Sequence, residues 1–332
     1  MLAKAARGLL DAYTDLQDET HAAICMDLQQ TLVTPRLSTN VAFYKRKIWT
    51  YNFGIHNLAT DAAPVMYVWN EAVGMRGSCE VASCLVHFVE HYLPAAVSKL
   101  TIFSDNCAGQ NKNLNISLQC LRLIHSQRFG LIKHYFLMPG HSFMPCDRDF
   151  GNLENYFRGR EIYTTDHYVE LMREARPQHP FTVVEMNSDR FLDLLPLQSL
   201  CTKTRMAKTR FKDGRLFVYK ADFKEGMRIY HSHFGEEEKQ APVEVKLQKG
   251  RRATYDPNRF DLSAVELPKK YPHGVALKKD KLDDLESLMP YIPLQYKAWY
   301  RDLFTAQGLI AELEAEHHPD DPDLEDDDVL DY

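Results

Sequence analysis

The order of apolar segments between residues 21 and 157 constrains the fold of this chain more than any other feature. Three segments typical of β-strands come first, and two further strands then alternate with segments whose apolar residues recur at helical spacing. The expected strands are 21–27, 43–55, 63–70, 99–104 and 132–138, and the expected helices are 79–92, 113–126 and 147–157. Three linked strands favour an antiparallel start, and the later alternation favours parallel pairing.

This order predicts an α/β (α+β) fold in which a mixed five-stranded sheet is flanked by helices. That layout is the one of ribonuclease H-like folds, and we expect it as a core over residues 21–163. Residues 1–20 predict an N-terminal helix, and the less regular residues 164–305 predict a smaller C-terminal accessory region, with helices near 166–176, 188–195 and 279–289. Residues 306–332 predict the end of a helix and an acidic, disordered tail.

The net charge of −6 conceals two regions of opposite sign. Residues 319–332 hold eight acidic and no basic residues, and the rest of the chain carries a charge of +2. Residues 202–252 hold 14 Lys and Arg against seven Asp and Glu. This basic region, with Lys208 and Arg210, is either a solvated surface or one that neutralises the phosphates of a nucleic acid.

The seven cysteines include no pair with C-x-x-C spacing, which favours reduced thiols in the nucleus or cytoplasm. The chain also holds no apolar run of about 18 residues, so we expect no membrane span. Neither zinc-ligand spacing nor a signal peptide is predicted.

Three acidic residues follow or end elements that would meet at one edge of the predicted sheet. Asp27 ends the first strand, Asp105 follows the fourth, and Asp147 opens the helix after the fifth. Carboxylate oxygens are the ligands that Mg²⁺ prefers, and Mn²⁺ accepts them as well. Two such ions can activate a nucleophile and stabilise the leaving oxygen of a phosphodiester. The three acids therefore predict a two-metal site, although an isolated Asp at a strand end is usually a turn or cap residue.

The third and fourth acids of this site stay open at the level of sequence. Asp149 and Glu154 lie on the same helix as Asp147, and Glu154 is two turns further along on the same face. We prefer Asp147 because it is nearest to the end of the fifth strand. Glu80, in the first turn of the first helix, is either a fourth ligand or a residue that interacts favourably with the helix N-terminus.

Two polar segments lie beside the predicted acids. Asn106, Gln110 and Lys112 follow Asp105 and precede a helix, where backbone amides and side-chain donors favour phosphate. His141 follows the fifth strand and is suited to contact phosphate or to assist proton transfer. An ordinary polar loop and a structural histidine explain these residues as well.

Several of these motifs together resemble a transposase-like domain family that is common in arthropod mobile elements. The resemblance rests on residues 26–30, 43–53 and 76–85, and above all on the run 104–113 with 139–142. It implies a ribonuclease H-like core of the DD(E/D) kind, with Asp27, Asp105 and Asp147, or Glu154, as catalytic acids. Gly151 departs from the family pattern and lowers helix propensity just after Asp147.

The resemblance implies a transposon-derived, metal-dependent polynucleotidyl transferase or nuclease that acts on DNA, with a homodimer as a further expected association. A domesticated or decayed copy that binds nucleic acid or protein without catalysis is the first alternative. The second alternative is a ribonuclease H-type nuclease that acts on an RNA–DNA hybrid or on strand ends, and a role for Glu80 as ligand would favour it.

Overall fold

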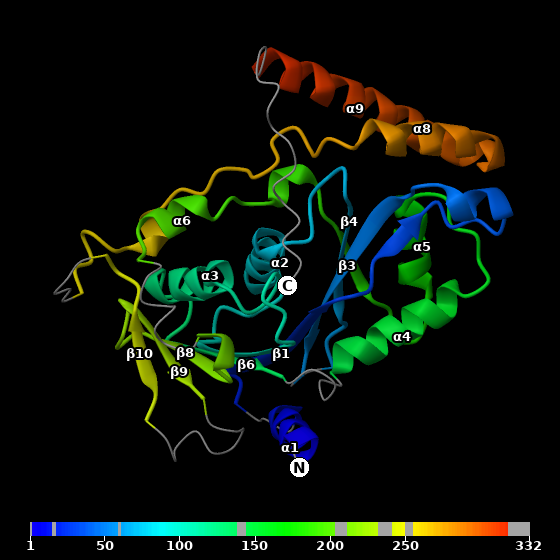
Figure 1. Ribbon diagram of the computed structural model, residues 1–332. Helices are drawn as coiled ribbons and strands as arrows, with labels where there is room; N and C mark the ends of the chain where they lie inside the picture. Colours follow the sequence, from blue (N-terminus) through cyan, green and yellow to red (C-terminus); the bar gives the residue numbers. More distant parts are fainter. Residues whose placement is uncertain are drawn as a thin grey trace.

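The computed structural model describes residues 2–14, 18–58, 61–137, 144–202, 211–231, 241–249 and 255–317. One mixed sheet runs through the molecule in the order β10-β9-β8-β6-β5-β1-β3-β4-β7, and β2 pairs with β3 (Figure 1). The strands are β1 (His21–Leu28), β2 (Leu32–Thr34), β3 (Ile48–Asn57), β4 (Val65–Asn70), β5 (Lys99–Ser104), β6 (Leu131–Phe136), β7 (Thr182–Glu185), β8 (Leu216–Lys220), β9 (Gly226–Tyr230) and β10 (Val243–Lys246). The α-helices are α1 (Leu2–Thr14), α2 (Ser78–His91), α3 (Leu114–His125), α4 (Pro145–Phe157), α5 (Thr165–Glu174), α6 (Leu195–Ser199), α8 (Lys279–Leu288) and α9 (Lys297–His317).

The mixed α/β class predicted from the sequence is confirmed, but the prediction of five strands is wrong. The five central strands have the order β6-β5-β1-β3-β4, in which β1 is parallel to β5 and antiparallel to β3. Strand β7 then extends the sheet beside β4, and β8, β9 and β10 extend it beside β6. The accessory region therefore contributes to the same sheet, because the edge strands of a five-stranded sheet carry unpaired backbone groups that these short strands satisfy.

Two local predictions differ from the structure. The strand expected at 43–55 begins only at Ile48, and Asn40–Tyr44 forms a short 3₁₀-helix, η1. Aromatic residues favour a strand only where a neighbouring strand pairs with them, and β2 pairs with β3 no earlier than Ile48. The helix expected near 188–195 is replaced by a 3₁₀-turn at Ser188–Arg190 and by α6, whose first turn contains a proline.

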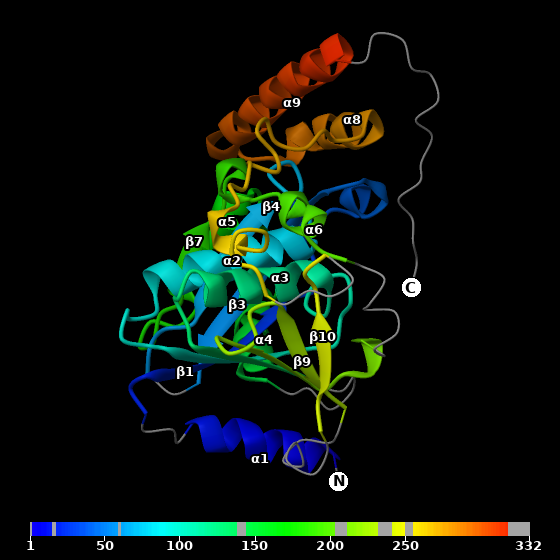
Figure 2. The same ribbon diagram turned by 90° about the vertical axis from the view of Figure 1, so that its left-hand side faces the viewer.

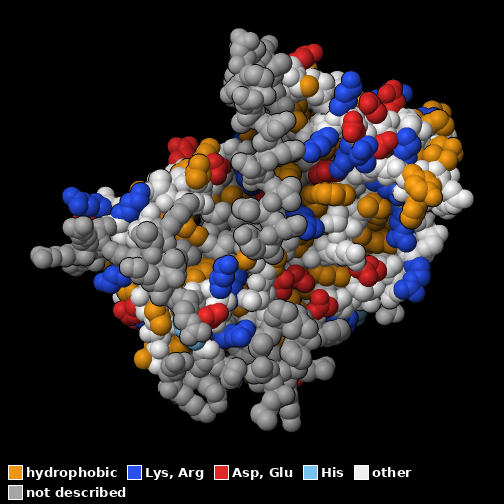
Figure 3. Space-filling model, viewed as in Figure 1, with side chains coloured by type: hydrophobic (Ala, Val, Ile, Leu, Met, Phe, Trp, Pro, Cys, Tyr) orange, Lys and Arg blue, Asp and Glu red, His pale blue; other side chains and the backbone are white. Residues whose placement is uncertain are grey.

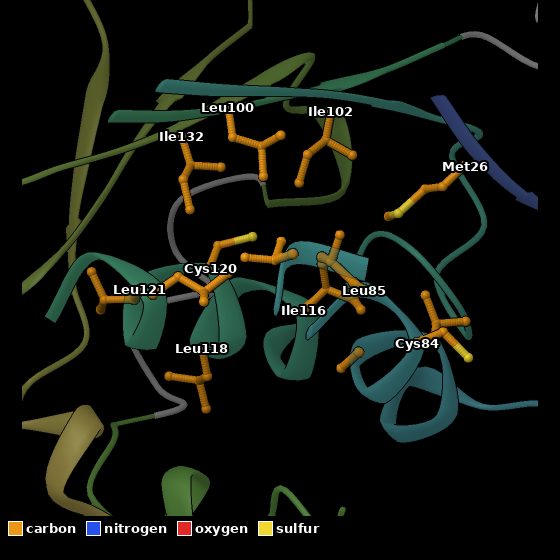
Figure 4. Close-up of a cluster of buried hydrophobic side chains, with 14 of the residues drawn as sticks. Met26, Cys84, Leu85, Leu100, Ile102, Ile116, Leu118, Cys120, Leu121 and Ile132 are labelled. Atoms are coloured by element: carbon orange, nitrogen blue, oxygen red, sulfur yellow. The ribbon is translucent and has the colours of Figure 1, made fainter. Parts of the chain in front are cut away.

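Helices α2 and α3 cover one face of the sheet and form the larger core with it. Figure 4 shows the side chains of both layers meeting there. The strands contribute Leu100, Ile102 and Ile132, and the helices contribute Leu85, Ile116 and Cys120. Each fully buried Leu or Ile side chain stabilises the fold by about 1.5–3 kcal/mol, which fixes the strand ends on which the candidate site lies.

Helices α1, α4 and α5 lie on the opposite face of the sheet (Figure 2). Helix α4 packs on β1 and β3, where Gly54 leaves room for the ring of Phe150. An added Cβ at Gly54 would lie 2.9 Å from that ring, so the close approach of α4 depends on this glycine. Helix α4 continues through Gly151 to Phe157 without interruption.

The last described helices, α8 and α9, form an outer layer at one end of the molecule (Figure 1). Their apolar residues pack with Ile48 at the start of β3 in a third, smaller cluster. The hydroxyl of Tyr300 donates to the carbonyl oxygen of Tyr163 at 2.6 Å. These contacts attach the C-terminal layer to the edge of the sheet at which β1 ends.

Candidate active site

Asp27 lies near the end of β1, and Asp105 directly follows the end of β5, the parallel neighbour of β1. Cys25 of β1 pairs with Phe103 of β5, and the same register continued by two residues puts Asp27 level with Asp105. Neighbouring strands lie about 4.8 Å apart. Because side chains alternate along a strand, Asp27 lies on the same face of β1 as Cys25, which contributes to the core beneath α4.

The first turn of α4 brings Asp147 to the same edge. Its Oδ2 accepts a hydrogen bond from the backbone amide of Met144 at 2.6 Å, which closes the helix N-terminus. The preceding residue, Cys146, lies against β1, with its sulfur 3.1 Å from the sulfur of Cys25. Since Cys25 is two residues before Asp27, this thiol pair positions the start of α4 beside the end of β1.

The three carboxylates share one electrostatic environment. The pKa of Asp27 is raised from 3.8 to about 7, chiefly by burial, and further by the charges of Asp105 and Asp147. A hydrogen bond from the amide of Leu28 opposes this rise. Burial and the charge of Asp105 also raise the pKa of Asp147, against the hydrogen bond from Met144. A cation placed among the three acids would remove the repulsion that causes part of these shifts.

Each of the three carboxylates keeps one oxygen available. Asp27 Oδ1 accepts from Leu28, and Asp105 Oδ1 accepts from the amide of Cys107 at 3.0 Å and from Asn111 Nδ2 at 2.6 Å. Within the described part of the chain, neither Asp27 Oδ2, Asp105 Oδ2 nor Asp147 Oδ1 receives a hydrogen bond. These three oxygens are therefore the ones that could face a metal ion.

Asn111 is a residue that the sequence reasoning did not single out as functional. Its side chain is 1% exposed, it holds Asp105 through the 2.6 Å hydrogen bond, and its own Oδ1 has no partner among the described residues. A buried amide oxygen without a donor next to a carboxylate is a further oxygen that suits a hard cation. Its place in the polar loop after Asp105 was the available signal, but the loop holds three asparagines and the sequence does not distinguish them.

The acids do not form a complete metal site as they stand. Over the residues that the structure describes, no group of three or more His, Cys, Asp or Glu side chains lies close enough together to hold one ion. The donors fit Mg²⁺ or Mn²⁺ in their chemistry, since all are oxygens, but at least one carboxylate must move toward the others for them to share an ion.

Glu80 lies elsewhere, and the structure gives it different partners. Its side chain is fully buried, accepts a hydrogen bond from the amide of Gly77 and pairs with Lys270 Nζ at 2.8 Å. The hydroxyl of Tyr271 also donates to it. The glutamate holds the segment before α8 against α2, so the expectation that it joins the three acids as a fourth ligand finds no support in its contacts.

The two alternatives for the third acid have separate surroundings. Asp149 is fully buried, forms an ion pair with Arg176 at 3.1 Å and shares a hydrogen bond with His56 Nδ1 at 2.7 Å, which explains it as a structural residue. Glu154 is exposed and accepts a hydrogen bond at 3.2 Å from Gln29, two residues after Asp27 on the chain. Of the three candidates, Asp147 is thus the one whose charge raises the pKa of Asp27. Glu154 lies further along α4.

Lys112 contacts protein atoms that sequence alone did not indicate. Its side chain is 5% exposed, and its ammonium group donates to Asn106 Oδ1 at 2.8 Å and to the carbonyl oxygen of Gly214 at 2.7 Å. Burial lowers its pKa to about 8. Lys112 therefore joins the loop after Asp105 to the turn before β8, and the interpretation of Lys112 and Asn106 as phosphate contacts is not supported by this geometry. Gln110 lies in the same loop and is half-buried.

Three of the predicted nucleic-acid contacts, His141, Lys208 and Arg210, lie outside the described residues, as does the acidic tail. Among the helices that the structure describes, none is both long and apolar enough to cross a membrane.

A comparison with families of known proteins finds a match to part of the chain. The profile of a family described as a domain of unknown function (DUF7869) matches residues 50–212, a segment that includes Asp105 and Asp147. No curated protein and no solved structure matches the chain.

Proposed function

We propose that this chain is a metal-dependent nuclease or polynucleotidyl transferase core with a ribonuclease H-like fold that acts on DNA phosphodiesters. The observation that carries the proposal is the arrangement of Asp27, Asp105 and Asp147. Burial and the charge of Asp105 raise the pKa of Asp27 and that of Asp147. Within the described part of the chain, each of the three carboxylates keeps one oxygen that accepts no hydrogen bond. Such mutual repulsion costs stability unless a cation is bound, and it is typical of functional sites.

The order and directions of the central strands support the ribonuclease H-like part of the proposal. Strands β1, β3 and β4 form an antiparallel meander, and β5 and β6 add to the other side of β1 in parallel. This is the mixed layout expected from the sequence, within a sheet extended at both edges. The resemblance to transposase-like domains supports a mobile-element origin, and the cysteine usage supports a nuclear or cytoplasmic location.

The chemistry at such a site would divide between the protein and the metal. Bound Mg²⁺ or Mn²⁺ would activate an attacking water or hydroxyl and stabilise the leaving oxygen. Asp27 and Asp105 would hold the cation on the rigid ends of β1 and β5. Asn111 would orient Asp105, and Asp147, on α4, would be the third carboxylate of the ligand set.

A cleavage and strand-transfer assay on DNA with Mg²⁺ or Mn²⁺ tests the proposal. We expect metal-dependent cleavage by the wild-type chain. In Asp105→Asn the cleavage rate should fall at least 100-fold, which is on the order expected when about 3 kcal/mol of transition-state stabilisation is removed. Asp149→Asn is unsuitable as a control because it breaks the buried ion pair with Arg176, whereas Asp302→Asn, at an exposed residue of α9, is a matched control. Activity that survives Asp105→Asn would refute the catalytic role.

One observation favours the alternative of a chain that binds nucleic acid without cleaving it. The described residues contain no complete group of metal ligands. A chain of that kind would bind DNA in the same assay, show no metal-dependent cleavage, and leave Asp27 and Asp105 without a role in binding. A role for Glu80 as a metal ligand would favour the ribonuclease H-type alternative, but Glu80 is paired with Lys270.

A further inference from the structure

Two aromatic rings are displayed on a short 3₁₀-helix at one end of the molecule. Phe43 and Tyr44 of η1 are 81% and 84% exposed, and their rings form an edge-to-face pair with centroids 5.2 Å apart. Figure 3 shows hydrophobic side chains beside Lys and Arg at the outer edge of this region. Exposed Phe and Tyr side chains lose the stabilisation that burial provides, so their display at a rigid position requires an explanation.

The backbone that carries these rings is held in place at both ends. Before η1, both the amide and the hydroxyl of Ser38 donate to Glu161. After η1, Lys45 and Arg46 form ion pairs with Asp284 of α8, each at 3.0 Å. Within η1, Ala42 is fully buried. The two rings are therefore presented to solvent by a fixed segment.

The charges beside the rings suit a phosphate backbone. Three consecutive cations, Lys45, Arg46 and Lys47, follow Tyr44 directly. The first two are paired with acids of α8, whereas Lys47 forms no ion pair within the described part of the chain. Nearby, Trp49 is 48% exposed, and Lys281 lies over its ring at 4.6 Å. Aromatic rings interleaved with cations are typical of surfaces that bind single-stranded nucleic acid.

The position of η1 relates it to the three acids. Strand β3 is antiparallel to β1, and Gly54 of β3 pairs with Asp27. Ile48, at the start of β3, lies six residues beyond Gly54, which is about 20 Å along the strand at 3.3 Å per residue. η1 ends at Tyr44, four residues before Ile48, and therefore lies beyond the sheet edge that carries Asp27 and Asp105. A DNA strand bound at the acids would cover the distance to the start of β3 in about six nucleotide steps of 3.4 Å, and η1 lies next along the chain from there.

We propose that Phe43 and Tyr44, with Lys47, form an accessory site that binds an unpaired segment of the DNA substrate by base stacking. The inference rests on the proposed function, because that function supplies DNA as the ligand. It adds that the substrate is single-stranded a few nucleotides from the reacting phosphodiester. Stacking requires exposed bases, so fully paired DNA cannot use this site.

Metal-free binding measurements test the accessory site separately from catalysis. Fluorescence anisotropy of a labelled mixed-sequence DNA strand, and of the same strand as a duplex, is measured in EDTA with the full chain. We expect Phe43→Ala and Tyr44→Ala each to weaken single-strand binding about tenfold and to change duplex binding less than about twofold. Phe43→Tyr keeps a stacking ring and should bind like the wild type. Leu294→Ala, at an aliphatic residue that is 83% exposed, is the matched control and should have no effect.

Four results would overturn the accessory site. In the first two, the wild type does not bind the single strand, or both alanine variants bind it as tightly as the wild type does. In the other two, the alanine variants lose equal affinity for the single strand and the duplex, or they lose self-association while their DNA binding is intact. The last result would assign the rings to a contact between copies of this chain. The binding measurement contains no metal, so the two proposals can fail separately. If the chain does not cleave DNA but Phe43→Ala selectively weakens single-strand binding, only the proposed function is rejected. If the chain cleaves DNA but Phe43→Ala does not selectively weaken single-strand binding, only the accessory site is rejected.

Discussion

The charge of Asp27 should make the metal-free protein less stable as pH rises, and replacing Asp27 by Asn should reverse this. The pKa of Asp27 is raised to about 7 by burial and by Asp105 and Asp147. Between about pH 4 and pH 7 the folded protein therefore binds a proton that the unfolded chain has released. The free energy of unfolding falls as pH rises through this window and is lowest above about pH 7.

The size of the effect follows from the two pKa values. The difference between 3.8 and about 7 corresponds to ~4 kcal/mol at 1.36 kcal/mol per pKa unit. Asp27 remains partly accessible to water, which screens its charge, so we expect about half of that value. Asp27→Asn keeps an oxygen that can accept from Leu28 and removes the charge. The variant should be about 2 kcal/mol more stable than the wild type near pH 8 and similar to it near pH 4.

Urea unfolding followed by circular dichroism, in EDTA and across this pH range, measures the difference. Added Mg²⁺ should stabilise the wild type near pH 8 but not Asp27→Asn, because the ion binds the folded form through the ionised carboxylate. Asp302→Asn, on the exposed side of α9, should leave the pH dependence unchanged. If Asp27→Asn is as stable as the wild type at every pH, the folded protein does not raise the pKa of Asp27 as inferred.

Three further substitutions separate structural from functional roles. Lys112→Ala should lower the free energy of unfolding by about 3 kcal/mol, because it removes a buried ammonium group from its oxygen acceptors. A variant that loses DNA affinity but is as stable as the wild type in urea unfolding would contradict this structural role of Lys112. Glu80→Gln should lower the free energy of unfolding by about 3 kcal/mol by breaking the ion pair with Lys270, whereas the cleavage activity per folded molecule should persist. A folded variant that no longer cleaves DNA would indicate that Glu80 is a metal ligand. Asn111→Ala should weaken Mg²⁺ binding about 10–100-fold by calorimetry, and unchanged affinity would limit Asn111 to shaping its loop.

The central elements could be predicted from the sequence because their signals are local. The apolar periodicity of α2, α3 and α4 and the short apolar runs of β4 and β5 place these elements within about two residues of their observed bounds. The added strands could not be predicted, because β7, β8, β9 and β10 are short and are defined by pairing with strands far away in the chain. Local patterns carry no information on such partners.

The same distinction applies to the candidate site. The positions of Asp27, Asp105 and Asp147 at the ends of elements could be inferred from the order of the elements. The partners of Glu80 and Lys112 could not, since Lys270 is 190 residues from Glu80 and the carbonyl of Gly214 is 102 residues from Lys112. The type of a charged residue indicates which interactions it can form. Its burial and its partners in the folded protein decide whether it stabilises the fold or binds a ligand.

The most direct test of the account is a crystal structure of the full chain with Mn²⁺ and anomalous diffraction near neutral pH. We expect Mn²⁺ between Asp27 and Asp105, about 2 Å from a carboxylate oxygen of each, with Asp147 or Glu154 drawn toward it. Mn²⁺ bound elsewhere, or absent while Asp27 and Asp105 keep their positions at high Mn²⁺ concentration, would contradict the metal site and the nuclease function derived from it.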